Sequence, residues 1–357
     1  MTRHTRPVLP TPTADIGDFT ERLGVAWGVS RGVSLIQYVA WSEGGGLFSL
    51  LAQRGRMTVN EMFDLLPFSN GGLEALLGVL ASLQLVERDQ RGAYRLTVSA
   101  REFLVQESPY YIGATLRLSQ NHPLPTAYLK APPTDETTSA ASATVPWSPL
   151  TTYSPWTPAE RLRIQHARNF APGVVAARSG CFDGIRRLID IGGGSGTIAI
   201  PLALDHADME ITIAELPDTL EDIRTILAEY GVDDRIQLIP LDALREEWHL
   251  PSCDAMLFGN FFHFCVDTEC RDLAARAFAH LPAGGRIWIH EVLMSETRDG
   301  PLLAALWSAN MAARRQGCRQ RTAEEFRRFL DDAGFEGPTV VPTSARFWLV
   351  GARKPPL

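Results

Sequence analysis

The sequence predicts an α/β protein in which a doubly wound, mostly parallel sheet follows a mainly α domain of the winged-helix type. Three observations support this class. The 357 residues exceed one average domain, and a prior of about 150 residues per domain suggests two. From residue 185 onward, short apolar segments alternate with helical ones, as in parallel sheets covered by helices. Residues 57–97 read helix, helix and hairpin, which is the order of a winged helix.

The elements of the first domain follow from apolar spacing and turn residues. Apolar residues recur at i, i+3 and i+4 in GVSLIQYVAW and LFSLLAQ, with the turn-forming SEGGG between them. MTVNEMFDLL predicts a short helix, and SNGGLEALLGVLASLQLV predicts a longer one with Ser69 or Asn70 as its N-cap. VERDQRGAYRLT predicts a hairpin that turns at Asp89 to Gly92. We assign residues 1–115 to this domain.

The charge distribution argues against nucleic acid as a partner. The helix from Leu73 to Leu85 would enter a DNA groove, yet it contains no Lys or Arg. The formal net charge of -7 also disfavours contacts with phosphates. A DNA-binding regulator is therefore disfavoured, and we expect a small-molecule partner. The apolar surface of the first helices is expected to pack against another subunit or against the second domain.

A Pro-, Ser- and Thr-rich segment, residues 124–158, is typical of an irregular surface connection. Its aromatic residues are Trp147, Tyr153 and Trp156. These side chains could cover a pocket or anchor the connection, and the sequence leaves the role of residues 131–158 open. A helix, AERLRIQHARNFA, follows. We group residues 116–175 as a linker with helices that contribute to the substrate pocket, and residues 176–357 as the second domain.

The second domain shows a regular alternation of predicted strands and helices. The predicted strands are RRLIDIG, EITIAEL, RIQLIPLD, DAMLFGNF and GRIWIHEVLM, followed by strands near TVVPTS and RFWLVGA. The helices between them include DTLEDIRTILAEYG and TECRDLAARAFAHL. Doubly wound sheets bind ligands at the carboxyl ends of their strands, so functional residues are expected there.

A glycine turn follows the first of these strands. LIDIGGGSGTIAI places Asp190, Gly192 and Gly194 in the pattern D-x-G-x-G-x-G, where the backbone can turn tightly and approach a ligand closely. Glu215 ends the next strand, where a carboxylate can accept both hydroxyls of a ribose. Asp242 follows the third strand and suits an adenine amino group. Thr197 stands where a dinucleotide fingerprint needs glycine, so the pattern favours S-adenosylmethionine over a nicotinamide cofactor. The alternative is a turn that only packs helix on strand.

Several motifs occur in an order that resembles a known family. They are the glycine turn, IAELP, LDAL, GNFFH, HEVLM and QRTAEEF. The chain resembles S-adenosylmethionine-dependent O-methyltransferases of the plant caffeate and bacterial polyketide-tailoring type over nearly its whole length. That resemblance implies a winged-helix dimerisation domain, a Rossmann-like catalytic domain and a homodimer. Within the motifs, it implies that further donor contacts come from Leu216, Ala243 and Asn260.

The resemblance also implies an acceptor site. His263 matches the family's general base, Glu291 matches an acid that flanks it, and Gln320 stands where a second flanking acid is often found. Phe264 replaces the usual Asp, so this acceptor is not expected to be held as the family's common acceptors are. Related enzymes take acceptor contacts from the helix before Gln320 and from the helix that enters the catalytic domain. The candidates there are Trp307, Asn310, Met311 and His166.

His263 has other interpretations. With Cys265 and Cys270 it offers only three ligands and lacks the paired spacing of structural zinc sites, so no metal is expected. A satisfied core histidine is a stronger alternative, because three phenylalanines surround it in FFHFCVDTEC. The same apolar surroundings suit a pocket for a flat hydrophobic acceptor. An imidazole suits proton removal because its unperturbed pKa, about 6.5, lies near working pH.

The leading hypothesis is O-methylation of an aromatic or polyketide-like small molecule in secondary metabolism, with His263 as general base. The alternative is an enzyme of the same fold that binds S-adenosylmethionine but methylates carbon or nitrogen, or catalyses hydroxylation, decarboxylation or a pericyclic rearrangement. The five cysteines and the absence of an apolar signal segment or spanning run favour free thiols and a cytoplasmic location, with no membrane partner.

Overall fold

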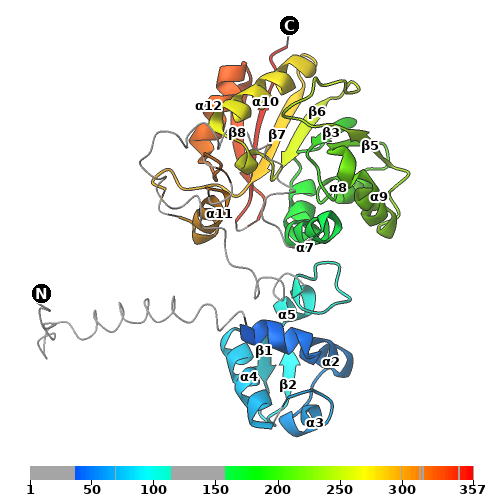
Figure 1. Ribbon diagram of the computed structural model, residues 1–357, viewed down its shortest axis with the longest axis vertical. Helices are drawn as coiled ribbons and strands as arrows, with labels where there is room; N and C mark the ends of the chain where they lie inside the picture. Colours follow the sequence, from blue (N-terminus) through cyan, green and yellow to red (C-terminus); the bar gives the residue numbers. More distant parts are fainter. Residues whose placement is uncertain are drawn as a thin grey trace, which may run out of the picture. The chain divides into compact units, whose positions relative to one another are not determined.

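The structure, a computed structural model, describes residues 37–68, 70–113, 157–298, 300–312, 315, 317–344 and 346–356 (Figure 1). The chain forms two compact units, residues 1–122 and 123–357. Trp147, Tyr153, Trp156 and the N-cap candidate Ser69 lie outside the described residues. Among the helices that the structure describes, none has both the length and the apolar character that crossing a lipid bilayer requires.

The first unit contains the predicted helix, helix and hairpin. Its elements are α2 (Leu47–Arg54), α3 (Val59–Phe63), α4 (Asn70–Ser82), β1 (Val86–Arg88), β2 (Tyr94–Leu96) and α5 (Val98–Phe103). The two strands pair antiparallel. Asp89 Oδ1 closes the turn between them by accepting hydrogen bonds from the backbone N–H groups of Arg91 and Ala93, both at 2.9 Å. The winged-helix order of elements is therefore confirmed.

Apolar spacing explains how these elements pack. Leu73, Leu77 and Leu80 recur at i, i+4 and i+7 on α4 and are fully buried, which places one face of that helix in the core. The side chains that they meet come from the neighbouring helices and from the hairpin. They include Leu47, Phe48, Leu51, Met62, Val86 and Leu96.

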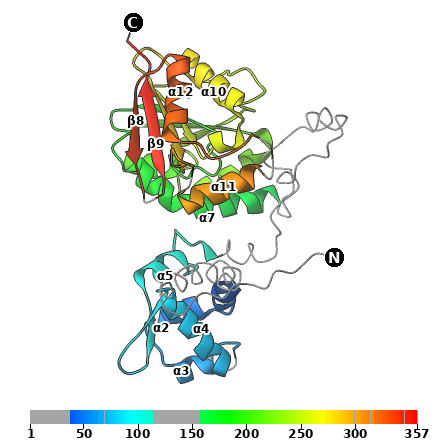
Figure 2. The same ribbon diagram turned by 90° about the vertical axis from the view of Figure 1, so that its left-hand side faces the viewer.

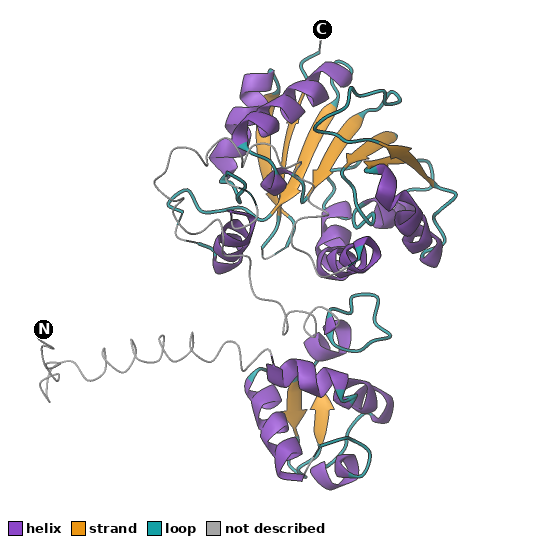
Figure 3. Cartoon of the chain, in the orientation of Figure 1, coloured by secondary structure: helices purple, strands orange, loops and turns teal. Residues whose placement is uncertain are grey.

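The second unit is built on a seven-stranded sheet (Figure 3). Its strands are β3 (Arg187–Ile191), β4 (Glu210–Glu215), β5 (Ile236–Pro240), β6 (Ala255–Gly259), β7 (Arg286–Glu291), β8 (Glu336–Pro342) and β9 (Trp348–Arg353). They lie in the order β5-β4-β3-β6-β7-β9-β8. The first five are parallel, and β9 is antiparallel to both β7 and β8. The predicted mostly parallel sheet is confirmed. Figure 2 shows β8 and β9 near the C-terminus.

Helices cover the sheet on both faces. They are α7 (Pro158–Ala177), α8 (Ala199–Asp205), α9 (Leu220–Glu229), α10 (Asp267–His280), α11 (Leu302–Ala312) and α12 (Ala323–Ala333), with single turns η3 (Pro217–Thr219) and η4 (Phe262–Phe264). α7 packs against α8 and α9, whereas α10 packs against α12. The β3-α8-β4 and β6-α10-β7 crossovers run in opposite directions along the sheet. Because such crossovers are right-handed, the two groups of helices lie on opposite faces.

The strand order reverses between β3 and β6, which are adjacent in the sheet. Loops that leave the carboxyl ends of these strands diverge to opposite faces, and open α/β sheets bind their ligands at this point. The glycine turn follows β3, and the FFHF segment follows β6. The fold thus brings the two sequence motifs with the clearest chemistry to one edge of the sheet.

Candidate active site

The glycine turn after β3 uses conformations that favour glycine. The φ angles of Gly192, Gly194 and Gly196 are 65°, 52° and 74°, in the left-handed region. A Cβ atom on Gly192 would lie 2.2 Å from a ring carbon of Phe261. A Cβ atom on Gly194 would have only a 4.0 Å contact with Leu162. The first glycine therefore admits an aromatic ring, and the second keeps the backbone open toward a ligand.

Asp190 is a buried carboxyl group with an unused acceptor. Its side chain is at the end of β3, the residue is 2% exposed, and Oδ1 has no hydrogen-bond partner among the described residues. Burial, together with the charge of Glu215, raises the pKa of this carboxyl well above its usual value. Buried polar groups without partners are costly, and strongly shifted groups concentrate at functional sites. Asp190 is therefore suited to a polar or cationic part of a ligand.

Glu215 holds the glycine turn and the start of its own loop. Its Oε2 accepts a hydrogen bond from the backbone N–H of Gly194 at 3.0 Å, and Oε1 accepts one from Leu216 at 2.8 Å. Burial and the nearby charge of Asp242 raise the pKa of Glu215, and the two backbone hydrogen bonds oppose that shift. The carboxylate thus fixes Gly194 and still has lone pairs for a further donor.

The third acidic side chain lies beyond β5. Asp242 Oδ1 accepts a hydrogen bond from the backbone N–H of Leu244 at 3.1 Å, and Asp242 Oδ2 lies 3.7 Å from a guanidinium nitrogen of Arg245. Ala243 is buried, and its carbonyl accepts a hydrogen bond from Trp248 Nε1 at 3.1 Å. Strands β3, β4 and β5 are neighbours in the sheet. The residues predicted to bind the donor therefore meet along three adjacent strand ends.

Asn260 adds a fourth strand end to this edge. It follows β6, its φ angle is 53°, and its backbone N–H donates to the carbonyl of His290 at 2.8 Å. Its Oδ1 is buried without a hydrogen-bond partner in the described part of the chain. A left-handed conformation at a residue other than glycine stores strain that is common at functional sites.

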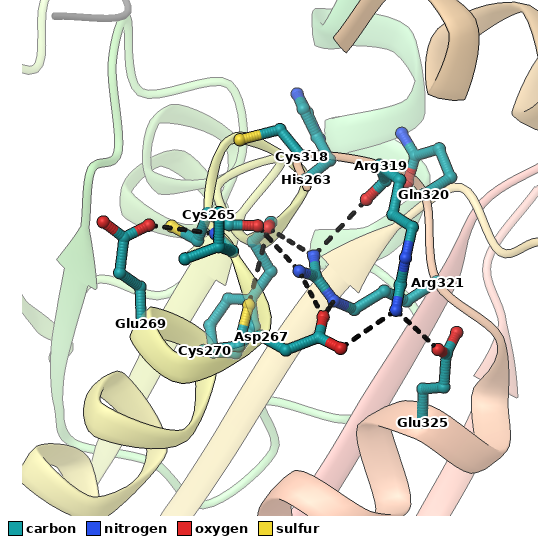
Figure 4. A network of polar contacts seen from close by, with 12 residues as sticks. His263, Cys265, Asp267, Glu269, Cys270, Cys318, Arg319, Gln320, Arg321 and Glu325 are labelled. Carbon is teal, nitrogen blue, oxygen red and sulfur yellow. Dashed lines mark hydrogen bonds and ion pairs between the residues drawn. The ribbon is translucent and has the colours of Figure 1, made fainter. Parts of the chain in front are cut away.

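His263 lies on the single turn η4 rather than on strand β6 itself, as Figure 4 shows. The residue is 5% exposed. Its Nδ1 lies 2.9 and 3.1 Å from the two carboxylate oxygens of Glu291, and its backbone N–H donates to Glu291 Oε1 at 3.2 Å. Glu291 ends β7 and is fully buried. Because an ionised carboxylate only accepts hydrogen bonds, the proton is on Nδ1 and the lone pair is on Nε2.

Aromatic and apolar side chains surround the imidazole. The ring centroid of His263 is 4.2 Å from that of Phe264 and 5.7 Å from that of Trp307. Met311, one turn after Trp307 on α11, is 8% exposed. The side chain of Asn310 lies outside the described residues. These contacts bring the predicted pocket residues of α11 and η4 together around the candidate base.

Gln320 does not orient His263. Its side chain is fully buried, and neither Oε1 nor Nε2 has a hydrogen-bond partner among the described residues. The expected imidazole contact is absent because Glu291 already occupies Nδ1 with both oxygens. Gln320 is held instead through its backbone N–H, which donates to Ser308 Oγ at 2.9 Å. Its amide thus remains a buried donor and acceptor pair without a partner in that part of the chain.

His166 supports the glycine turn. Its Nδ1 lies 2.9 Å from Ser195 Oγ and its Nε2 lies 2.8 Å from the Tyr230 hydroxyl, while its ring stacks on Phe170. Burial lowers the pKa of His166 to about 4, so the ring is neutral at pH 7. Since both ring nitrogens are engaged, the predicted role in the acceptor pocket has no support in these contacts. Sequence reasoning missed Ser195 and Tyr230, which no motif linked to His166.

The cysteines of FFHFCVDTEC make local contacts. Cys265 Sγ lies 3.7 Å from the carbonyl of Phe261, and Cys270 Sγ lies 3.7 Å from the carbonyl of Phe262. Both are fully buried, and Cys270 is on α10 as predicted. All five cysteines are free. Small buried thiols of this kind pack as weakly polar side chains.

Comparisons with known proteins agree with this geometry. Residues 164–336 match the O-methyltransferase domain family, and residues 46–106 match the O-methyltransferase dimerisation domain family. The chain is 30% identical over 306 residues to 3-hydroxy-5-methyl-1-naphthoate 3-O-methyltransferase of Streptomyces sahachiroi, covering 81% of this chain and 82% of the relative. It is 29% identical over 322 residues to N,N-dimethyltransferase OxyT of Streptomyces rimosus, covering 87% and 90%.

Solved structures show the same fold. Human N-acetylserotonin methyltransferase in complex with S-adenosylmethionine aligns with a TM-score of 0.75 and 21% identity, over 97% of this chain and all of that one. CalO1, a methyltransferase of calicheamicin biosynthesis, aligns with a TM-score of 0.73 and 19% identity, over 96% and 100%.

Proposed function

The chain belongs to the S-adenosylmethionine-dependent O-methyltransferase family, and we propose that it methylates a hydroxyl group of an aromatic or polyketide-like small molecule, with His263 as general base. The observation that carries this proposal is the buried contact between His263 Nδ1 and Glu291. That contact leaves the Nε2 lone pair for a hydroxyl proton, and the carboxylate stabilises the imidazolium that forms.

The donor-binding edge fits S-adenosylmethionine, a ligand with a sulfonium, an ammonium group and a ribose but no phosphate. When bound, the donor supplies an activated methyl group. Asp190 and Asn260 offer buried oxygens without partners in the described part of the chain, which suits the ligand's cationic and hydrogen-bonding groups. Glu215 and Asp242 suit its ribose hydroxyls and adenine amino group. The open backbone at Gly194 admits the ligand, while Leu216 and Ala243 would line the same site.

The acceptor class follows from the surroundings of His263. Phe264, Trp307 and Met311 make that side of the site apolar, and pockets of this kind take flat hydrophobic ligands. Gln320, in the α11–α12 loop, provides an amide without a partner among the described residues. The Streptomyces relative named for a hydroxynaphthoate supports an aromatic hydroxyl as the acceptor.

Transfer to nitrogen is the second candidate. The relative OxyT is named an N,N-dimethyltransferase, and Phe264 and Gln320 make this site less acidic than the family pattern. An amine acceptor makes a different demand on the base, because a neutral amine attacks before its proton leaves. C-methylation or a non-methylating reaction such as hydroxylation, decarboxylation or pericyclic rearrangement would leave donor binding intact while aromatic hydroxyls stay unmethylated.

A methyl-transfer assay tests the main proposal. Labelled S-adenosylmethionine is incubated with the enzyme and a panel of hydroxynaphthoates and aromatic amines, and the methylated atom is identified. His263→Ala is compared with His249→Ala, an exposed histidine, at saturating donor. We expect a loss of about 10²- to 10⁴-fold for His263→Ala and little change for the control. Equal rates for both variants would remove His263 from the chemistry.

Donor binding is tested separately by calorimetry with S-adenosylhomocysteine. Glu215→Ala should weaken binding, because Glu215 fixes Gly194 and offers its remaining lone pairs to the ribose. Unchanged affinity would contradict the assigned donor site, whatever the acceptor is.

We also propose a homodimer formed through the first unit, which the match to a dimerisation domain supports. The three-part division at residues 115 and 175 and a cytoplasmic location belong to the same proposal. The five free thiols are consistent with a reducing compartment.

A further inference from the structure

Arg321 is a fully buried arginine close to the candidate base (Figure 4). Arginine is almost never fully buried unless it is paired, because the desolvation of its charge must be offset. No step of the proposed chemistry uses this guanidinium. Its contacts therefore indicate what the buried charge does.

The guanidinium of Arg321 holds the turn that carries His263. Its Nη1 donates to the carbonyl of Phe262 at 2.7 Å, and its Nη2 donates to the carbonyl of Cys265 at 2.7 Å. These two carbonyls lie on either side of His263 in the sequence. The carbonyl between them, that of Phe264, lies 2.9 Å from Cys318 Sγ. The segment before α12 thus contacts three carbonyls around His263.

Asp267 balances the charge of Arg321. Its Oδ1 lies 3.1 Å from Arg321 Nε and 2.9 Å from Nη2. Asp267 opens α10, where the positive end of the helix dipole stabilises a carboxylate. Arg319 donates to the other oxygen of Asp267 at 3.0 Å and to Glu325 at 2.9 Å. The buried cation is therefore paired, and the side chain of the neighbouring Arg319 shares its carboxylate partner while directing these hydrogen bonds to acids rather than to the turn.

We propose that Arg321 is a positioning residue for His263: it fixes the η4 turn from one side while Glu291 fixes the imidazole from the other. The proposal rests on the proposed function for the role of His263 as base. Glu291 alone leaves the backbone after His263 unrestrained. Arg321 supplies that restraint at Phe262 and Cys265, so Nε2 has a defined place relative to an acceptor hydroxyl.

The geometry requires a guanidinium. Arg321 uses Nε, Nη1 and Nη2 together, in a planar fork that reaches two carbonyls and a carboxylate. A lysine ammonium keeps the charge but cannot present donors in this fixed arrangement. Removing the fork leaves two buried carbonyls without these donors. A shift of about 1 Å at a catalytic group can reduce a rate by about 100-fold.

Nuclear magnetic resonance of the full chain tests the proposal without an acceptor. The chain is labelled with ¹⁵N-histidine, and the His263 signals are assigned by comparison with His263→Ala. The parent should show Nδ1–H, because Glu291 accepts that proton. Arg321→Met should shift or broaden the signals, and Arg321→Lys should restore them only in part. Arg319→Met is the matched control and should leave them unchanged.

Stability and activity readouts complete the test. Thermal unfolding and S-adenosylhomocysteine affinity show whether each variant is folded. If Arg321→Met does not fold, Asp267→Asn weakens the hold on Arg321 at a partly exposed position and should shift His263 in the same direction by a smaller amount. With a hydroxynaphthoate that the parent methylates, Arg321→Met should lower kcat by about 100-fold, with KM for the donor within about twofold.

The outcomes are distinguishable. His263 signals that do not change in Arg321→Met, or that change equally in Arg319→Met, overturn the positioning role. So does an unchanged kcat. If the parent methylates no hydroxyl acceptor, the proposed function fails, while the His263 signals still decide whether Arg321 positions the ring.

Discussion

At the residue scale, the chemistry of His263 depends on its carboxylate partner. Glu291 is fully buried and contacts Nδ1 with both oxygens. It therefore selects the tautomer in which Nε2 is free and stabilises the protonated ring after proton transfer. Gln320, the other predicted flanking residue, has no hydrogen bond to the imidazole. One carboxylate rather than two acids controls this base.

Glu291→Gln should keep the shape of the site and lose most of the methyl transfer. The amide cannot stabilise an imidazolium as a carboxylate does, and its NH₂ group can donate to Nδ1 and force the proton onto Nε2. We expect the single-turnover rate with a hydroxynaphthoate to fall by about 10²- to 10⁴-fold. S-adenosylhomocysteine affinity should be unchanged. A variant that retains the parental rate would show that the ring needs no charged partner.

At the element scale, the glycine turn is shaped by the aromatic ring that packs against it. Gly192→Ala places a methyl group 2.2 Å from the Phe261 ring and adds the strain of a φ angle of 65°. Gly231→Ala is the matched control, because Gly231 has the same φ angle and a Cβ atom there would have no neighbour within 4 Å. We expect only Gly192→Ala to weaken S-adenosylhomocysteine binding, by at least about tenfold. Calorimetry measures both.

A second element-scale prediction concerns the contacts between α7, the glycine turn and the residue after α9. The pKa of His166 is lowered to about 4 in the folded protein, against about 6.5 when unfolded. The unfolded chain therefore binds a proton first as pH falls. Stability from neutral His166 is present above pH 6.5 and is lost as pH falls through 4, by up to about 3 kcal/mol.

His166→Gln should remove part of that pH dependence. The melting temperature of the parent and the variant is measured from pH 7.5 to pH 4, with His249→Ala as an exposed control. The difference between parent and variant should shrink steadily below pH 6.5. A constant difference across this range would mean that His166 does not titrate on unfolding.

The sequence predicted most of this architecture because its signals are local. A strand, a glycine turn and a helix are contiguous, so Asp190 and Gly194 could be placed at a strand end, and Glu215 followed from the next strand. Contacts between distant segments were not predictable. Ser195 and Tyr230 lie 29 and 64 residues from His166. Arg321 lay within a recognised motif, but its full burial depends on carbonyls 56 and 59 residues away.

At the scale of the whole molecule, the first unit presents an aromatic pair that its own core does not use. Tyr38 and Trp41 pack edge to face with ring centroids 5.7 Å apart, yet they are 37% and 53% exposed. Exposed aromatic side chains are enriched at protein interfaces. The match of residues 46–106 to a dimerisation domain gives this surface a partner, a second copy of the chain.

Sedimentation tests this assembly with two substitutions of similar exposure. The parent should sediment at twice its mass of 39.3 kDa over a wide concentration range. Trp41→Glu places a charge on the aromatic pair and should raise the dimer dissociation constant by at least about tenfold, as expected for a central aromatic contact. Leu204→Glu, at a position 57% exposed on α8, should leave the dimer intact. A monomeric parent would contradict the dimer, whereas dissociation by Leu204→Glu alone would place the interface on the second unit.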